Sequence, residues 1–112
     1  MKWNHLTNET QLATIKERSA TVPQVIFKHS TRCSVSMVAL GRLGRSQEPE
    51  GVEFHLLDLL QHRDLSGKVA ETFAVQHQSP QVLLIQNGSC TYNESHFGIE
   101  MPVILEKAKV TV

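Results

Sequence analysis

The residue with the clearest capacity for chemistry is Cys33, one of two cysteines in a chain of 112 residues. It follows an apolar segment, Gln24 to His29, and a polar turn, and it opens a segment up to Leu43 that favours a helix. At the first turn of a helix, backbone N–H groups point outward and the dipole is positive, which favours the thiolate form of a thiol. The order strand, turn, cysteine, helix therefore predicts a nucleophile for thiol–disulfide exchange.

The residues around Cys33 indicate which kind of thiol chemistry is available. Arg32 adds positive charge, and the hydroxyl groups of Thr31 and Ser34 are donors for a sulfur atom or a ligand. Ser36 stands three residues after Cys33, where a two-thiol redox motif has its resolving cysteine, so we expect a monothiol mechanism. We count Ser36 among the ligand-contacting residues. On local sequence alone, a buried Cys33 that acts as a small apolar residue is an equally good interpretation.

A second candidate feature is Ser79-Pro80, which comes directly before the apolar run Val82 to Ile85. Proline is accepted at the start of a strand because its missing N–H group lies outside the hydrogen-bonded ladder. Trans is the commoner isomer of X–Pro bonds, but the combination with a helix headed by cysteine favours cis. A cis bond here exposes the backbone of Ser79 to an extended thiol ligand. Ser79 and Pro80 are therefore expected to bind substrate.

Cys90 follows the turn signal Asn87-Gly88 and is expected to pack as a structural residue, with a role in resolving a Cys33 disulfide left open. None of the six histidines stands at zinc-ligand spacing from a cysteine, so no metal site is expected. The formal net charge is zero, which gives no general attraction to nucleic acid or anionic lipid. The amino-terminal residues lack the apolar core of a signal peptide and no apolar run could cross a bilayer, which favours a cytoplasmic protein.

The elements that must position these residues follow from apolar patterns and helix caps. Asn8 and Gln11 form a capping box for a helix that ends near Ser19. Further helices are expected over Cys33–Leu43, around Leu65, Val69 and Phe73, and over Ile99–Ala108, and strands over Gln24–His29, Val52–Asp58, Val82–Ile85 and Ser89–Tyr92.

This alternation of strands and helices, closed by a hairpin, predicts one α/β domain over residues 1–112. Its core is expected to be a four-stranded mixed sheet with helices on both faces. In the helix that begins at Cys33, the side chains of Val35, Met37 and Val38 are expected to face inward. Trp3 is expected to pack on the first helix.

Three segments together resemble the YtxJ family, the monothiol bacilliredoxins. They are Lys28-His29-Ser30-Thr31-Arg32-Cys33, Leu56 to Asp64, and His77 to Gln81, and the likeness extends from about Asn8 to the final helix. The resemblance implies a thioredoxin-like fold and a bacterial cytoplasmic protein. It also implies that the partners are bacillithiol, a low-molecular-weight thiol, and client proteins that carry it in mixed disulfides.

On this resemblance, Cys33 is the reactive cysteine and Ser79-Pro80 is the cis-proline site, while Thr31 and Arg32 belong to the approach to the cysteine. Ser34 stands where many members of the family have proline.

The sequence leaves three alternative functions open. The first is a monothiol thiol–disulfide oxidoreductase that removes bacillithiol from client proteins through Cys33, with bacillithiol as co-substrate and no bound cofactor. The second is a non-catalytic thioredoxin-like binding or adaptor domain. The third is a two-cysteine reductase in which Cys90 resolves Cys33.

Overall fold

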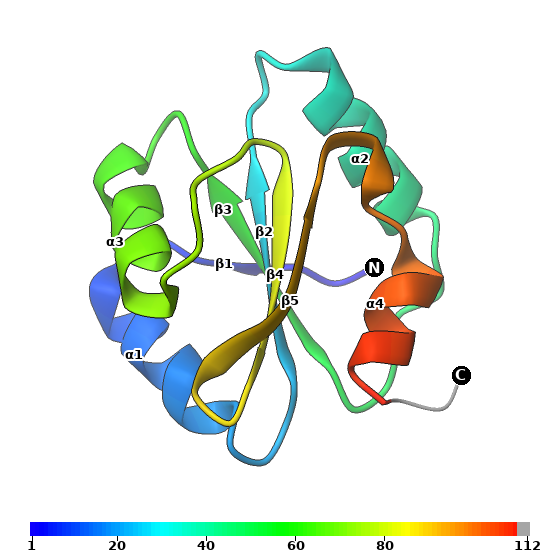
Figure 1. The fold of residues 1–112 in the computed structure, drawn as a ribbon. Helices are drawn as coiled ribbons and strands as arrows, with labels where there is room; N and C mark the ends of the chain where they lie inside the picture. Colours follow the sequence, from blue (N-terminus) through cyan, green and yellow to red (C-terminus); the bar gives the residue numbers. More distant parts are fainter. Residues whose placement is uncertain (110–112) are drawn as a thin grey trace.

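The computed structural model describes residues 1–109, which form a mixed sheet with helices on both faces (Figure 1). In chain order the elements are β1 (Asn4–His5), α1 (Glu9–Arg18), β2 (Gln24–His29), α2 (Ser34–Gly44), β3 (Glu53–Asp58), α3 (Arg63–Phe73), β4 (Gln81–Gln86), β5 (Ser89–Ser95), the 3₁₀ helix η1 (His96–Gly98) and α4 (Met101–Lys107). Within these residues, no helix is long and apolar enough to cross a membrane.

The sheet has five strands in the order β1-β3-β2-β4-β5, one more than the sequence predicts. The strands β1, β3 and β2 run parallel, and β4 and β5 pair antiparallel with their neighbours. The additional strand, β1, is only two exposed residues long, so it carries no alternating apolar pattern. Its pairing with His55 and Leu56 of β3 is a long-range contact that local sequence does not encode.

The core lies in two layers, one on each face of the sheet. On one face, α1 and α3 bring Leu12, Ile15, Leu65, Val69 and Phe73 against Ile26, Leu57, Leu83 and Ile85 of the sheet. On the other face, α2 and α4 bring Ala39, Leu43, Ile104 and Leu105 against Val25, Phe27, Phe54 and Val82. The strands β2 and β4 are covered on both faces, as their continuous apolar runs predict.

Trp3 packs on the sheet rather than on the first helix. Its ring lies 5.9 Å from the ring of Phe27 and 6.0 Å from that of Phe54, centroid to centroid. Both phenylalanines belong to the layer covered by α2 and α4. The expected contact with α1 is therefore wrong, because the pairing of β1 with β3 carries Trp3 to the opposite face.

The helix α2 turns a different side to the sheet from the one expected. Met37 and Val38 are 49% and 52% exposed, whereas Ser36, Ala39 and Leu43 are buried. The spacing of three and four residues is the ordinary stripe of a buried helix face. The prediction was wrong because the stripe begins with a serine and an alanine, which a pattern of large apolar residues does not detect.

The helix boundaries agree with their capping signals at the start of the chain and differ at the end. The Asn8 side chain accepts a hydrogen bond from the Gln11 N–H group at 2.9 Å, and the Gln11 side chain accepts one from the Asn8 N–H group at 3.1 Å. The expected capping box is thus confirmed. The last helix begins at Met101 instead of Ile99, because Ile99 and Glu100 have extended backbones.

Candidate active site at Cys33

Cys33 is the N-cap residue of α2, at the end of the sheet where β2 finishes (Figure 1). Its N–H group donates to the carbonyl oxygen of Ser30 at 3.2 Å, and its own carbonyl oxygen accepts from the N–H group of Met37 at 3.0 Å. The side chain is partly exposed and makes no capping hydrogen bond. The thiol is therefore at the positive end of the helix and is available to a second sulfur atom.

The buried side chain of Ser36 fixes the turn that carries Cys33. This serine is 0% exposed, and its hydroxyl accepts a hydrogen bond from the Ser30 N–H group at 3.0 Å. The same hydroxyl lies 2.7 Å from Nδ1 of His29. Burial lowers the pKa of His29, against a smaller opposite effect of Asp58.

Ser36 is therefore not on the surface that a ligand would contact, contrary to the expectation from sequence. Its place is between the end of β2 and the turn, where it fixes the backbone of Ser30. Sequence reasoning missed this role, although a polar residue on the buried stripe of an amphipathic helix was a usable signal.

The other residues expected near the thiol are on the surface. Thr31, Arg32 and Ser34 are exposed. The Arg32 N–H group lies 3.4 Å from the hydroxyl of Ser30, a weak bond that closes the turn. The three side chains are thus free of the core and adjacent to Cys33 in the chain.

The Ser79–Pro80 peptide bond is cis, as expected from its place before a strand together with the helix headed by Cys33. Its place follows from the register of β2 and β4, in which Gln81 pairs with Lys28 near the end of β2. Pro80 consequently lies at the same end of the sheet as Cys33 (Figure 1). Its carbonyl oxygen accepts a hydrogen bond from the His96 N–H group at 3.1 Å, which ties this segment to η1.

The segment before Pro80 is fixed by the buried side chain of Gln81. The amide of Gln81 donates to the carbonyl oxygen of Gln76 at 3.0 Å and accepts from the N–H group of Gln78 at 3.2 Å. The hydroxyl of Ser79 is buried and has no hydrogen-bond partner among the described residues. What Ser79 can offer to a ligand is therefore its backbone and not its hydroxyl.

Cys90 lies at the other end of the sheet. It pairs with Ile85, which in turn pairs with Gln24, the first residue of β2. His29 is five residue steps along the strand from Gln24, or about 17 Å at roughly 3.3 Å per residue. A disulfide needs Cα atoms within about 7 Å, so this register opposes a disulfide between Cys90 and Cys33.

The environment of Cys90 is that of a structural residue. Its thiol donates to the carbonyl oxygen of Tyr92 at 3.3 Å. Burial raises the pKa of the Cys90 thiol, which disfavours its thiolate. The environment of Cys90 thus disfavours nucleophilic chemistry at its thiol, whereas Cys33 is at the start of α2.

Exposed apolar side chains beside α2 were not anticipated from the sequence. Met37, Val38 and Phe97 are 49%, 52% and 69% exposed. The element η1, which carries Phe97, contacts α2, and the side chain of Arg42 lies 3.4 Å from the Phe97 carbonyl oxygen. Exposed apolar side chains thus lie both on the helix that begins after Cys33 and on η1, which contacts it.

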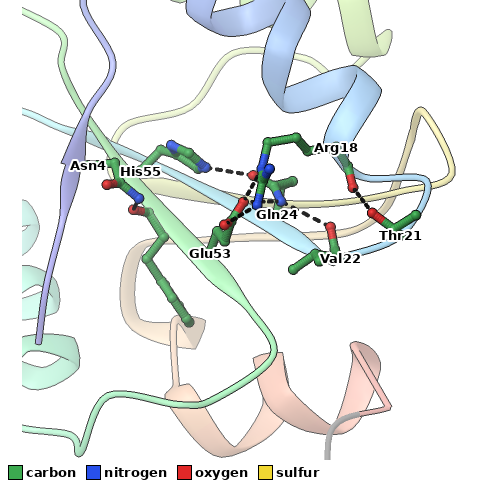
Figure 2. Close-up of polar contacts among 8 residues, drawn as sticks. Asn4, Arg18, Thr21, Val22, Gln24, Glu53 and His55 are labelled. Atoms are coloured by element: carbon green, nitrogen blue, oxygen red, sulfur yellow. Dashed lines mark hydrogen bonds and ion pairs between the residues drawn. The ribbon is translucent and has the colours of Figure 1, made fainter.

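A separate polar network lies at the far end of β2 and β3 (Figure 2). The carboxylate of Glu53 accepts hydrogen bonds from Nε of Arg18 and from the Gln24 amide, both at 2.7 Å. The hydrogen bond from Arg18 is the main reason that the pKa of Glu53 is lowered to about 2. Nε2 of His55 lies 2.8 Å from the Gln24 amide oxygen. This network joins α1 to the sheet away from Cys33.

The fold and the position of the cysteine define a class of protein, the thioredoxin-fold thiol proteins. One similar solved structure, assigned provisionally as an oxidoreductase with a thioredoxin fold, has 27% identity and a TM-score of 0.80, with 94% of this chain and 91% of that chain covered. The thioredoxin of Fasciola hepatica has 16% identity and a TM-score of 0.72, covering 95% and 96%. Mitochondrial thioredoxin 3 of Saccharomyces cerevisiae has 21% identity and a TM-score of 0.69, covering 94% and 91%.

The sequence narrows the class further. Residues 4–104 match the family of the monothiol bacilliredoxin BrxC, so the chain belongs to that family. Family and fold together support a thiol–disulfide oxidoreductase role.

Proposed function

We propose that this protein removes bacillithiol from mixed disulfides on client proteins, with Cys33 as the nucleophile. The observation that carries the proposal is the placement of a partly exposed thiol, free of any capping bond, at the first turn of α2. The cis-Pro80 segment lies at the same end of the sheet. A serine replaces the resolving cysteine three residues on and is fully buried, which supports a monothiol reaction.

The reaction proceeds by exchange of one disulfide for another. The thiolate of Cys33 attacks the bacillithiol sulfur of the client's mixed disulfide, and the bond between bacillithiol and the client breaks. The client leaves as a thiolate and takes a proton from water. Cys33 then carries bacillithiol in a new disulfide. A second bacillithiol attacks that disulfide at the bacillithiol sulfur, restores Cys33 and leaves as the symmetrical disulfide.

The surroundings of the thiol have defined parts in this proposal. The N–H groups at the start of α2 stabilise the attacking thiolate and the leaving Cys33 thiolate of the second step. The exposed side chains of Thr31, Arg32 and Ser34 contact the incoming thiol, and the backbone of Ser79 pairs with it beside Pro80. The partners are thus a small thiol and S-thiolated client proteins, and the proposed compartment is the reducing cytoplasm.

The test follows the mass of each partner by intact-protein mass spectrometry. A client with one bacillithiolated cysteine is mixed with the wild-type chain, with Cys33→Ser and with Cys90→Ser. We expect bacillithiol to move from the client to the wild-type and Cys90→Ser chains, and client release to be lost with Cys33→Ser. Undiminished release by Cys33→Ser would remove Cys33 from the mechanism. A wild-type chain that never carries bacillithiol would favour the binding domain.

A further inference from the structure

The imidazole ring of His29 is a buried titratable group next to the turn that carries Cys33. His29 is the last residue of β2, is 4% exposed and stacks on Phe27, with 5.8 Å between the ring centroids and 23° between the ring planes. The carbonyl oxygen of His29 accepts a hydrogen bond from the Leu59 N–H group at 2.8 Å, so its backbone is fixed as well. The ring therefore has a defined position, and the proposed exchange reaction does not use it.

Three consecutive contacts connect this ring to the backbone of Cys33. Nδ1 of His29 lies 2.7 Å from the hydroxyl of Ser36. That hydroxyl accepts a hydrogen bond from the Ser30 N–H group at 3.0 Å. The carbonyl oxygen of Ser30 in turn accepts from the N–H group of Cys33 at 3.2 Å. The backbone position of Cys33 thus depends on Ser30, and that of Ser30 depends on how Ser36 and His29 share their protons.

The count of donors and acceptors in this cluster favours one arrangement of the protons. A hydroxyl has one proton to donate and two lone pairs that accept. Ser36 is 0% exposed, and among residues 1–109 its hydroxyl has no hydrogen-bond partner besides the Ser30 N–H group and Nδ1 of His29. If Nδ1 carried a proton, the hydroxyl would accept twice and its own proton would be buried without an acceptor, which is costly. Every group is satisfied when Nδ1 is unprotonated and accepts from Ser36.

The charged groups near His29 leave its ring neutral at pH 7. Burial lowers the pKa of His29 from its ordinary 6.5, and the carboxylate of Asp58, its partner residue on β3, has a smaller opposite effect. Within the part of the chain that the structure describes, Asp58 is the one charged group that shifts this pKa. Lys28, the neighbour in β2, is directed to the opposite face of the sheet. From the turn before α2, the groups that can carry charge are Cys33 and the exposed Arg32.

A second proton on the ring would disturb this arrangement. Nδ1 of His29 would then have to donate to the Ser36 hydroxyl, which already accepts from Ser30. The serine proton would lose its acceptor in the core, and the ring would carry a buried positive charge. Rotation of the Ser36 hydroxyl group away from Ser30 relieves the conflict. The Ser30 backbone, which accepts the hydrogen bond from Cys33, then loses its support.

We propose that His29 is a positioning residue for Cys33: the neutral ring holds Ser36 against Ser30 and so fixes the turn, and protonation of the ring releases the turn and slows thiol–disulfide exchange. This rests on the proposed function, in which Cys33 is the nucleophile, and adds regulation of that site by pH. A protonated ring also adds positive charge near the thiol, which favours the thiolate. The slower exchange is therefore expected in the rate constant per thiolate and not as a smaller fraction of thiolate.

The test measures the exchange rate and the fraction of thiolate separately, in a Cys90→Ser chain that has Cys33 as its one thiol. The ultraviolet absorbance of the thiolate gives its fraction between about pH 4.5 and pH 8. Hydroxyethyl disulfide, a reagent without titratable groups, gives the second-order rate constant at each pH. With His29 present, we expect the rate constant per thiolate to fall about tenfold toward the acid end, the size of one buried hydrogen bond that loses its partner.

Two substitutions of His29 and one control make the result specific. His29→Asn offers an amide oxygen as acceptor and gains no proton, so its rate constant per thiolate should not depend on pH. His29→Leu removes the acceptor and should be slow at every pH. His5→Asn changes an exposed histidine of β1 and should follow the profile of the chain with His29. A further readout needs no variant, because the ¹⁵N resonances of the His29 ring should show Nδ1 without a proton at about pH 7.5.

The outcomes separate this role from the proposed function. A rate constant per thiolate that does not change with pH, an acid fall that persists in His29→Asn, or a proton on Nδ1 at neutral pH would each overturn the role of His29 and leave the proposed function standing. If the acid fall is present but bacillithiol stays on the client protein, the proposed function is overturned and the role of His29 stands. A Cys33 thiol that does not react with hydroxyethyl disulfide would overturn both.

Discussion

At the scale of single residues, the hydroxyl of Ser36 helps to fix the turn that carries Cys33. It bridges Ser30, which anchors the N–H group of Cys33, and His29, the last residue of β2. A cysteine at this position would be a resolving thiol, whereas a serine can satisfy two buried polar partners at once. The residue that stands where a two-thiol motif has its second cysteine is thus also the residue that holds the turn.

We predict that Ser36→Ala lowers the free energy of unfolding by about 1–3 kcal/mol, because it leaves the Ser30 N–H group and His29 Nδ1 buried without a partner. Urea denaturation measures this loss. The transfer rate to Cys33 should fall as well, since the turn loses its support. Ser89→Ala, an exposed serine at the far end of the sheet, is the control and should change neither quantity. Equal stability of Ser36→Ala and Ser89→Ala would contradict the bridge.

At the scale of elements, the sequence predicted those whose signals are local. The capping box at Asn8, the continuous apolar runs of β2 and β4 and the stripe of α3 follow from nearest neighbours along the chain. The strand β1 could not be predicted, because its two residues are polar and exposed and are ordered only by β3. The buried face of α2 was mistaken because small residues form it.

Features of the candidate site could also be predicted only where their signals are local in the sequence. Cys33 at a helix start was predictable, since turn and cap signals are short-range, whereas the cis bond before Pro80 was expected only from its combination with the helix headed by Cys33. The contact of Lys28 with His77 was not predictable, because 49 residues separate them and only the pairing of β2 with β4 brings their segments together. The burial of Ser36 likewise depends on how α2 packs.

For the element α1, we predict that Asn8→Ala lowers the free energy of unfolding by about 1 kcal/mol, because the N-cap side chain satisfies the N–H group of Gln11. Chemical denaturation measures the change, and Asn8→Asp, which retains an accepting oxygen, should restore most of it. The transfer rate to Cys33 should stay at the wild-type value, because α1 begins away from the thiol. A loss of more than a few kcal/mol would mean that Asn8 has further partners.

At the scale of the whole molecule, the two ends of the sheet are specialised differently. One end gathers Cys33, the Pro80 segment and the buried Lys28, which has no carboxylate within ion-pair distance in the part of the chain that the structure describes. The other end is closed by the network of Arg18, Gln24 and Glu53, in which each charge has its partner (Figure 2). The ion pair of Arg18 and Glu53 thus lies away from the end where reactivity is proposed.

The network predicts how stability depends on acid. The pKa of Glu53 is lowered to about 2 in the folded chain, against an ordinary value of 4.5. The unfolded chain therefore binds more protons between these values, and the stabilisation that is present above about pH 5 is lost as the pH falls toward 2. Urea denaturation between pH 2 and 7 should show a smaller acid loss for Glu53→Gln than for wild type. Glu48→Gln, an exposed glutamate outside the network, should follow the wild-type curve.

The position of the single tryptophan makes its fluorescence a probe of the edge of the sheet. Because Trp3 is seated between Phe27 and Phe54 by the pairing of β1 with β3, its fluorescence reports whether the edge strand is docked. Undocking would move the indole into water and shift its emission to longer wavelengths. No label is needed to follow folding of this edge, and the signal comes from a layer to which Cys90 and Lys28 do not belong.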